Sequence, residues 1–186
     1  RDALRRFVPS GVLDAERRVI QAGNSIGGAI SQDGRIVAVA NYAPGGVRLF
    51  DARTLEPLAE VRTGAKVVGI ADAPGNRFVF SLFEAGEIWI VDALDPRRPV
   101  VKRITGIGKQ PYDGFVTPSG RHYLAGLFGE DGLALVDLWD AEPRFKRPFH
   151  LIASALRALP TTINASSGLR LQLNRCGHMP FYWGPP

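Results

Sequence analysis

The chain has 186 residues, a formal net charge of +5, three histidines and one cysteine. A single cysteine, Cys176, excludes an internal disulfide framework and a Cys-x-x-Cys metal site. The sequence contains no apolar run of about 18 residues, so it predicts no transmembrane helix. Residues 1–142 hold 17 basic and 18 acidic residues, and this near-neutral balance argues against a nucleic-acid partner.

Residues 1–18 form an arginine-rich basic lead without any repeated landmark. Three similar units then follow, over about residues 19–62, 63–106 and 107–142. Each unit has a turn glycine, an apolar strand, a second glycine-containing turn and a strand that ends in aspartate. The turn glycines are Gly34, Gly75 and Gly120, and the terminal aspartates are Asp51, Asp92 and Asp137.

The spacing of these landmarks predicts an all-β fold. Both the turn glycines and the aspartates are separated by 41 and then 45 residues, so whole units are repeated. A repeat of this length with four short strands is typical of β-propeller blades. Because a propeller ring needs roughly four to eight blades, three blades indicate a fragment of a larger propeller. The outer fourth strands are expected at residues 57–62 and 100–104.

The first strands of the three units share a glycine six residues before each turn glycine, namely Gly28, Gly69 and Gly114. Glycine weakens a strand, so its recurrence indicates crowding near the propeller axis or close approach of a ligand. Asp51, Asp92 and Asp137 recur in every unit and are therefore expected to organise turns. After residue 142 the pattern stops. Residues 143–186 contain six Lys or Arg and no Asp or Glu, and we interpret this atypical tail as out of frame or disordered.

Several ordered stretches of the repetitive body resemble one protein family. They are residues 19–31, 41–46, 85–88, 110–114, 126–132 and 135–139, and they include the segment Gln110-Pro111-Tyr112-Asp113-Gly114. Together they resemble the NirF-type heme d1 biosynthesis proteins over about residues 17–140. The last stretch is also similar, more loosely, to the d1 domain of cytochrome cd1 nitrite reductase.

The resemblance implies an eight-bladed parent propeller that binds heme d1 or its dihydro precursor. It also implies late-stage tetrapyrrole oxidation, from a propionate to an acrylate side chain, as in a dihydro-heme d1 dehydrogenase. The product would supply cytochrome cd1 nitrite reductase for denitrification in the periplasm. Implied protein partners are that reductase and other heme d1 assembly proteins. A non-enzymatic heme d1 binding and transfer protein, and the d1 domain of a nitrite reductase itself, are the alternatives.

Propeller geometry gathers the candidate binding residues on one face. The loop into each first strand and the turn between the second and third strands emerge on the same side of a propeller. A flat macrocycle with carboxylates suits a mixture of aromatic, amide and hydroxyl groups. We expect cofactor binding by Asn24, Ser25, Asn41, Tyr42, Gln110, Tyr112 and Phe128. The alternative for the aromatic residues, including Phe83, is that they wedge between neighbouring blades.

Asp113 is the candidate catalytic residue. It lies seven residues before its turn glycine, where the other two units have Gly27 and Val68. A carboxylate that breaks the repeat could orient a substrate pyrrole or accept a proton. Alternatively, Asp113 caps backbone amides of its own loop.

A metal site is not predicted. His122 begins a second strand on the opposite face, where a structural role is expected, and His150 and His178 lie in the atypical tail. An axial ligand for a heme iron is therefore expected outside the three units. The body also lacks a P-loop and a GxSxG motif.

Overall fold

The computed structural model of the chain describes residues 24–140 with their side chains. Outside this range it describes the backbone of five short strands. They are β1 (Val12–Leu13) and β2 (Val19–Gln21), which pair with each other, β14 (Phe145–Lys146), and the pair of β15 (Ile163–Asn164) and β16 (Arg170–Leu171). Apart from these strands, the basic lead (1–18) and the acid-free tail (143–186) lie outside the described residues.

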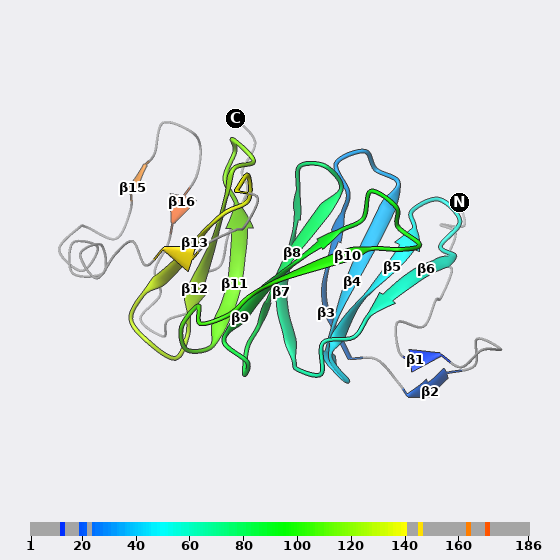
Figure 1. Cartoon of the computed structure of the whole chain (residues 1–186), viewed down its shortest axis with the longest axis horizontal. Helices are drawn as coiled ribbons and strands as arrows, with labels where there is room; N and C mark the ends of the chain where they lie inside the picture. The colour runs from blue at the N-terminus through cyan, green and yellow to red at the C-terminus, as the bar shows by residue number, and fades with distance from the viewer. Residues whose placement is uncertain are drawn as a thin grey trace. The chain divides into compact units, whose positions relative to one another are not determined.

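The described chain is all-β, as the sequence predicts, and contains three four-stranded antiparallel sheets (Figure 1). Blade 1 consists of β3 (Asn24–Ile30), β4 (Ile36–Ala43), β5 (Gly46–Asp51) and β6 (Pro57–Val61). Blade 2 consists of β7 (Val67–Ala73), β8 (Arg77–Leu82), β9 (Glu87–Asp92) and β10 (Val100–Ile104). Blade 3 consists of β11 (Pro111–Val116), β12 (His122–Leu127), β13 (Leu133–Asp137) and β14. The strands of each blade pair in chain order, and they are called A to D below.

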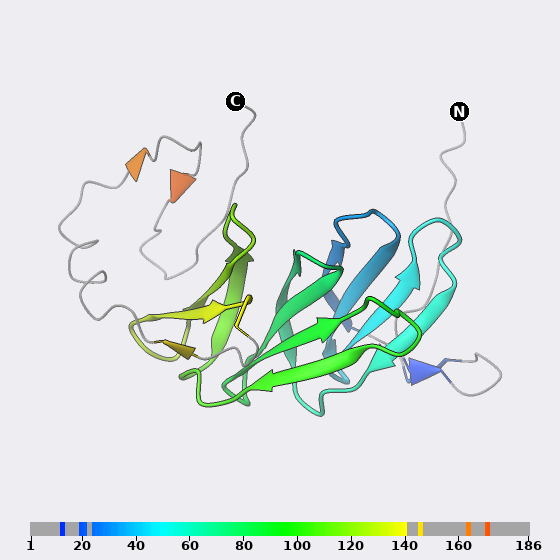
Figure 2. The same ribbon diagram turned by 45° about the horizontal axis from the view of Figure 1, so that its top comes forward.

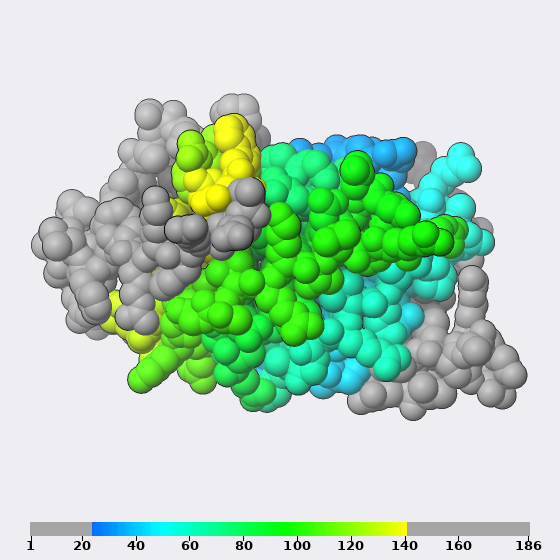
Figure 3. Space-filling view, in the orientation of Figure 1, coloured from blue at the N-terminus to red at the C-terminus, as the bar shows by residue number. Residues whose placement is uncertain are grey.

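The three blades lie side by side in chain order (Figures 1 and 2). Their A strands are neighbours, and β7 of blade 2 contacts both β3 and β11. This radial arrangement of the innermost strands is that of a β-propeller. In the space-filling view, green residues of blade 2 directly border cyan residues of blade 1 (Figure 3).

Two apolar clusters hold the blades together. One lies between blades 1 and 2 and includes Leu49, Phe80 and Trp89, and the other lies between blades 2 and 3 and includes Ile90 and Tyr123. Blade 2 has a neighbour on each side, so β8 is buried on both faces from Phe78 to Leu82. In β12 only alternate residues are fully buried, because the period of a strand is two and the buried residues face blade 2.

The repeated aspartates cap the turns between strands C and D. Asp51 Oδ1 accepts hydrogen bonds from the amides of Arg53 and Thr54, at 2.9 and 2.7 Å. These bonds hold the pKa of Asp51 below its usual value. Asp92 and Asp137 each accept a bond of 3.0 Å from the amide two residues later. The structure thus gives these three carboxylates the turn-organising role that their recurrence indicates.

A second recurring bond ties this turn to the turn between strands A and B. The amide that follows each aspartate donates to a carbonyl next to a turn glycine. The pairs are Ala52 to Arg35 (2.8 Å), Ala93 to Asn76 (3.0 Å) and Leu138 to Arg121 (2.7 Å). The A–B turn and the C–D turn lie on the same side of each blade. A backbone hydrogen bond therefore holds these two turns together in every blade.

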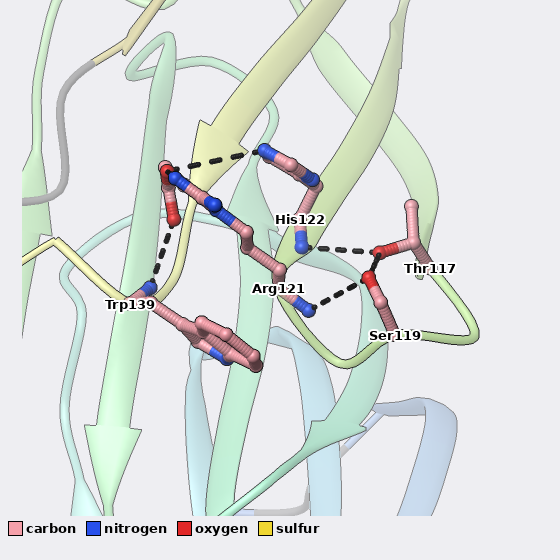
Figure 4. A network of polar contacts seen from close by, with 6 residues as sticks. Thr117, Ser119, Arg121, His122 and Trp139 are labelled. Atoms are coloured by element: carbon pink, nitrogen blue, oxygen red, sulfur yellow. Dashed lines mark hydrogen bonds and ion pairs between the residues drawn. The ribbon is translucent and has the colours of Figure 1, made fainter.

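In blade 3 the same face carries a denser polar network (Figure 4). The guanidinium of Arg121 donates to Asp137 Oδ2 at 2.8 Å and lies over the ring of the exposed Trp139. His122 Nε2 lies 3.9 Å from the same carboxylate oxygen. The hydrogen bond from Arg121 is the largest cause of the lowered pKa of Asp137. The closeness of His122 to Asp137 is consistent with the structural role expected for His122.

Crowding by backbone atoms explains two of the three shared glycines, Gly69 and Gly114, and Gly28 has a looser contact. Gly69 has a φ of +59°, and a Cβ on it would lie 2.9 Å from the Cα of Asp113 in the neighbouring A strand. A Cβ on Gly28 would lie 3.2 Å from the carbonyl oxygen of Ala38. A Cβ on Gly114 would overlap the carbonyl of Leu124 and lie 2.6 Å from the hydroxyl of Tyr123. In each case the close neighbour belongs to the chain itself.

Candidate functional site

The D–A loops and the B–C turns meet on one side of the blades, which we call the loop face. It comprises the D–A loops 62–66 and 105–110 and the B–C turns 44–45, 83–86 and 128–132. The amide of Phe83 donates to the carbonyl of Lys66 at 3.1 Å, and the amide of Phe128 donates to that of Gln110 at 2.9 Å. Each loop is thus bonded to the turn of the blade that follows it, as propeller geometry predicts.

Blade 1 contributes four of the predicted binding residues. Asn24 and Ser25 are exposed at the start of β3, where the pairing with β4 is irregular. Asn41 is only 5% exposed, and its Oδ1 accepts a long bond of 3.4 Å from the hydroxyl of Ser25. Asn41 is therefore a buried hydrogen-bond partner of Ser25, whereas Asn24 and Ser25 are accessible to solvent.

The fourth residue, Tyr42, is joined to blade 2 through a lysine. Lys66 Nζ lies 5.0 Å from the centroid of the Tyr42 ring and 2.6 Å from Glu84 Oε1. The hydrogen bond to Glu84, followed by that to Tyr42, raises the pKa of Lys66, so the side chain is a cation at neutral pH. Neither Lys66 nor Glu84 was among the residues predicted to bind.

Blades 2 and 3 together form an aromatic cluster of Phe83, Tyr112 and Phe128. The ring centroids lie 5.8 Å apart for Phe83 and Tyr112, 5.8 Å for Phe83 and Phe128, and 5.9 Å for Tyr112 and Phe128. Such spacings are those of favourable tilted and edge contacts. Phe128 is 55% exposed and Tyr112 is 40% exposed, so these two rings offer an accessible apolar surface, and Phe83 contacts both of them across the boundary between blades 2 and 3.

Asp113 follows Tyr112 on β11. Its side chain is exposed, and Oδ1 accepts a 2.9 Å bond from the amide of Gly114. The pairing of β11 with β12 is irregular between Pro111 and Gly114, and Asp113 lies against Gly69 of the neighbouring blade. The hydroxyl of Tyr123 is buried beneath this segment, and burial raises the pKa of Tyr123. Asp113 thus combines one backbone bond with access to solvent.

Gln110 ends the D–A loop that leads into Asp113. Its φ is +52°, an uncommon conformation for a residue other than glycine. Its carbonyl accepts the bond from Phe128, and its side chain is exposed. In the same loop the amide of Lys109 donates to Glu130 Oε1 at 3.3 Å. The loop is therefore fixed against the B–C turn of blade 3.

These contacts make one continuous row across the loop face. Tyr42 of blade 1 contacts Lys66, the backbone of Lys66 binds that of Phe83, and the ring of Phe83 contacts Tyr112 and Phe128. The structure therefore brings Tyr42, Tyr112 and Phe128 into one row, and Asp113 follows Tyr112 on β11. The position of Phe83 in the repeat, equivalent to Tyr42 and Phe128, was the signal that could have placed it in the site.

Within residues 24–140, no group of three or more His, Cys, Asp or Glu side chains is arranged to hold a metal ion. In the same part of the chain, no helix has the length and apolar character needed to span a membrane.

Comparison with known proteins confirms the family resemblance predicted from the sequence. The family model for the cytochrome d1 heme domain matches residues 2–149, a longer range than the predicted 17–140 and one that includes the basic lead. Protein NirF of Pseudomonas aeruginosa is 54% identical over an alignment of 153 residues, and the match covers 78% of this chain and 39% of the relative. Protein NirF of Stutzerimonas stutzeri is 55% identical over an alignment of 140 residues, and the match covers 71% of this chain and 36% of the relative.

Among solved structures, the dihydro-heme d1 dehydrogenase NirN in complex with DHE is 28% identical, with a TM-score of 0.56. The match covers 63% of this chain and 27% of NirN. Hydrazine synthase of Kuenenia stuttgartiensis has a TM-score of 0.61 at 18% identity, over 74% of this chain and 38% of that protein. The β-propeller domain of Cps50 (Swd1) from Myceliophteria thermophila has a TM-score of 0.56 at 18% identity, over 82% of this chain and 50% of that domain. The last two likenesses concern the propeller fold alone.

Proposed function

Because the chain belongs to the cytochrome d1 heme domain family, we propose that its loop face binds a heme d1-type tetrapyrrole. The observation that carries this proposal is the continuous row of side chains across three blades, from Tyr42 through Lys66 to Phe83, Tyr112 and Phe128. The relatives named NirF and the likeness to NirN support a place in heme d1 biosynthesis.

The chemistry of this row fits a large planar ligand with ionised carboxylates. The exposed rings of Tyr112 and Phe128 offer flat apolar contact, and aromatic contacts of this kind contribute about 0.5–1.5 kcal/mol beyond buried area. The hydroxyl and amide groups of Ser25, Asn24 and Gln110 can donate hydrogen bonds to carboxylates. Asn41 would act through Ser25, because its own side chain is buried.

The finer proposal is that the protein oxidises a propionate side chain of the bound precursor to an acrylate. That reaction breaks two C–H bonds, forms one C=C bond, and releases two protons and two electrons. The electrons would pass to an external electron-carrier protein. Asp113 would take up one of the protons, since its carboxylate is exposed and follows Tyr112 of the aromatic cluster on β11.

The proposed setting follows from the same relatives. Heme d1 made in this way would serve cytochrome cd1 nitrite reductase in denitrification, and the proposed compartment is the periplasm. The proposed protein partners are that reductase and other proteins of heme d1 assembly. The chain spans 39% and 36% of the length of the two curated relatives, so these statements concern the whole protein.

Binding can be tested by titrating heme d1 into the protein expressed from its complete gene. Phe128→Leu removes an exposed ring from the loop face and should weaken binding by about tenfold, since the expected loss of about 1.4 kcal/mol equals that factor. Trp139→Leu is the matched control, because Trp139 is a 62% exposed ring on the opposite face. Equal affinities for the two variants would refute the loop face as the binding site.

The reaction can be tested separately with Asp113→Asn, which keeps the size of the side chain and removes its charge. Turnover of the dihydro precursor should fall by roughly a hundredfold or more, the usual scale for an acid–base group, while heme d1 affinity stays within about twofold. Normal turnover by this variant would favour the alternative of a protein that binds and transfers the tetrapyrrole.

A further inference from the structure

We infer that Lys66 binds a carboxylate of the tetrapyrrole, and that Glu84 occupies Lys66 until the ligand replaces it. This inference rests on the proposed function, and it assigns a specificity-determining residue within the loop face. It depends on three properties of the pair, which are its accessibility, the fixed position of the lysine and its place beside the aromatic cluster.

The ion pair is open to solvent. The side chain of Lys66 is 38% exposed and that of Glu84 is 56% exposed, although Nζ and Oε1 are only 2.6 Å apart. An exposed ion pair contributes little to stability, because water screens it and two long side chains lose freedom when they form it. A ligand carboxylate can therefore take the place of Glu84 at little cost to the fold.

The lysine would keep its position after such an exchange. The Nζ atom lies over the ring of Tyr42, 5.0 Å from its centroid, and this contact does not involve Glu84. The backbone of Lys66 is also fixed, because its carbonyl accepts the amide of Phe83. Lys66 is thus oriented before the ligand arrives, and a preorganised group gives a stronger contact than one that must be ordered on binding.

The lysine also lies next to the apolar part of the row. Its backbone partner, Phe83, contributes one of the three rings of the aromatic cluster. A macrocycle in contact with these rings would have its edge toward the D–A loop 62–66, which carries Lys66. Carboxylates are carried on the edge of such a ring, so the cation and the rings suit different parts of one molecule. Glu84 competes with the same carboxylates for Lys66 and so weakens the binding of acidic ligands, whereas Lys66 is the group that favours them.

The experiment compares heme d1 with its fully methylated ester, and the protein is expressed from its complete gene. Lys66→Met should weaken binding of the free acid by about tenfold and change binding of the ester by less than twofold. Glu84→Gln should tighten binding of the acid several-fold, because the competing charge is removed, and leave the ester unchanged. Lys66→Arg should restore most of the affinity for the acid, because it restores the cation.

Arg62→Met is the matched control. Arg62 is a cation of the same D–A loop, but it is paired with Glu60 at the end of the outer strand β6. This variant should change neither affinity. A ratio of acid to ester affinity that stays constant in Lys66→Met and Glu84→Gln would overturn the inference, even if both ligands bind and Phe128→Leu weakens them. If the unmodified protein binds neither form, the proposed function itself is refuted.

Discussion

Replacing Gly69 with alanine tests whether contact between neighbouring A strands shapes the loop face. Gly69 has a φ of +59°, and the added methyl carbon would lie 2.7 Å from Oδ1 of Asp113. The same carbon would lie 2.9 Å from the Cα of Asp113 and 3.1 Å from the carbonyl oxygen of Tyr112. Two of these three atoms belong to the backbone of β11, which cannot move aside as the end of a flexible side chain can.

Two effects add in this variant. A left-handed conformation costs a residue with a Cβ roughly 1–2 kcal/mol. Forcing extra volume into a packed site costs about 1–3 kcal/mol more, because the backbone of β11 must shift. The expected loss in the free energy of unfolding is therefore about 2–5 kcal/mol. Tyr112 and Asp113 lie on the displaced segment, so heme d1 affinity should fall as well.

Gly64→Ala separates the two effects. Gly64 has a φ of +66°, but a Cβ on it would meet no atom within 4 Å, so only the conformational cost remains. Urea unfolding followed by circular dichroism, on the protein expressed from its complete gene, would measure both variants. Gly69→Ala should lower the free energy of unfolding by at least about 1 kcal/mol more than Gly64→Ala does. Equal losses would show that the contact between β7 and β11 is not tight.

Two further predictions concern bonds between blades on the face opposite the loop face. Asp33 accepts bonds from Ser31, Arg35 and, across the blade boundary, Asn76, and these bonds lower its pKa. A lowered pKa in the folded state stabilises the protein above the ordinary value of 3.8 and ceases to do so as the pH falls toward the lowered value. Asp33→Asn should therefore lower the thermal unfolding midpoint at pH 7, and the difference in midpoint from the unmodified protein should shrink below about pH 4. A difference in midpoint that stays constant down to about pH 2 would contradict this prediction. Arg77 donates 2.7 Å bonds to the carbonyls of Pro74 and, in blade 3, Leu138. Arg77→Met should therefore reduce the free energy of unfolding, measured by urea titration, by about 1–3 kcal/mol. A loss below about 0.5 kcal/mol would count against this link between the blades.

The fold could be predicted from the sequence because its landmarks have local physical causes. The turn glycines 34, 75 and 120 all have positive φ, which is why that residue type recurs there. The aspartates recur because each one accepts the amide two residues later. The D strand of blade 3, Phe145–Lys146, was not predicted, since two residues carry no detectable alternation.

The loop face could be predicted only in part. Strand order alone places Tyr42, Tyr112 and Phe128 on one side of the blades, and the structure places them there. The partners of Lys66 could not be predicted, because its contacts with Tyr42 and Glu84 depend on the spacing between two blades. The burial of Asn41 was missed for a related reason. Strand β4 continues to Ala43 beyond its apolar run, and Asn41 still pairs there with Gly46.

The backbone bond between the two turns of each blade sets a fixed length in the chain. The turn glycine and the capping aspartate are 17 residues apart in every blade, from 34 to 51, 75 to 92 and 120 to 137. All four additional residues of the longer repeat fall between positions 92 and 120, in the C–D turn, the D–A loop and the irregular start of β11. The length of this 17-residue segment, which contains strands B and C, is therefore the same in all three blades. Changes in length fall outside this segment: two of the additional residues lie in the C–D turn, and the other two lie in the D–A loop and at the start of β11, next to the loop face. The loop face can therefore change while the paired strands stay the same.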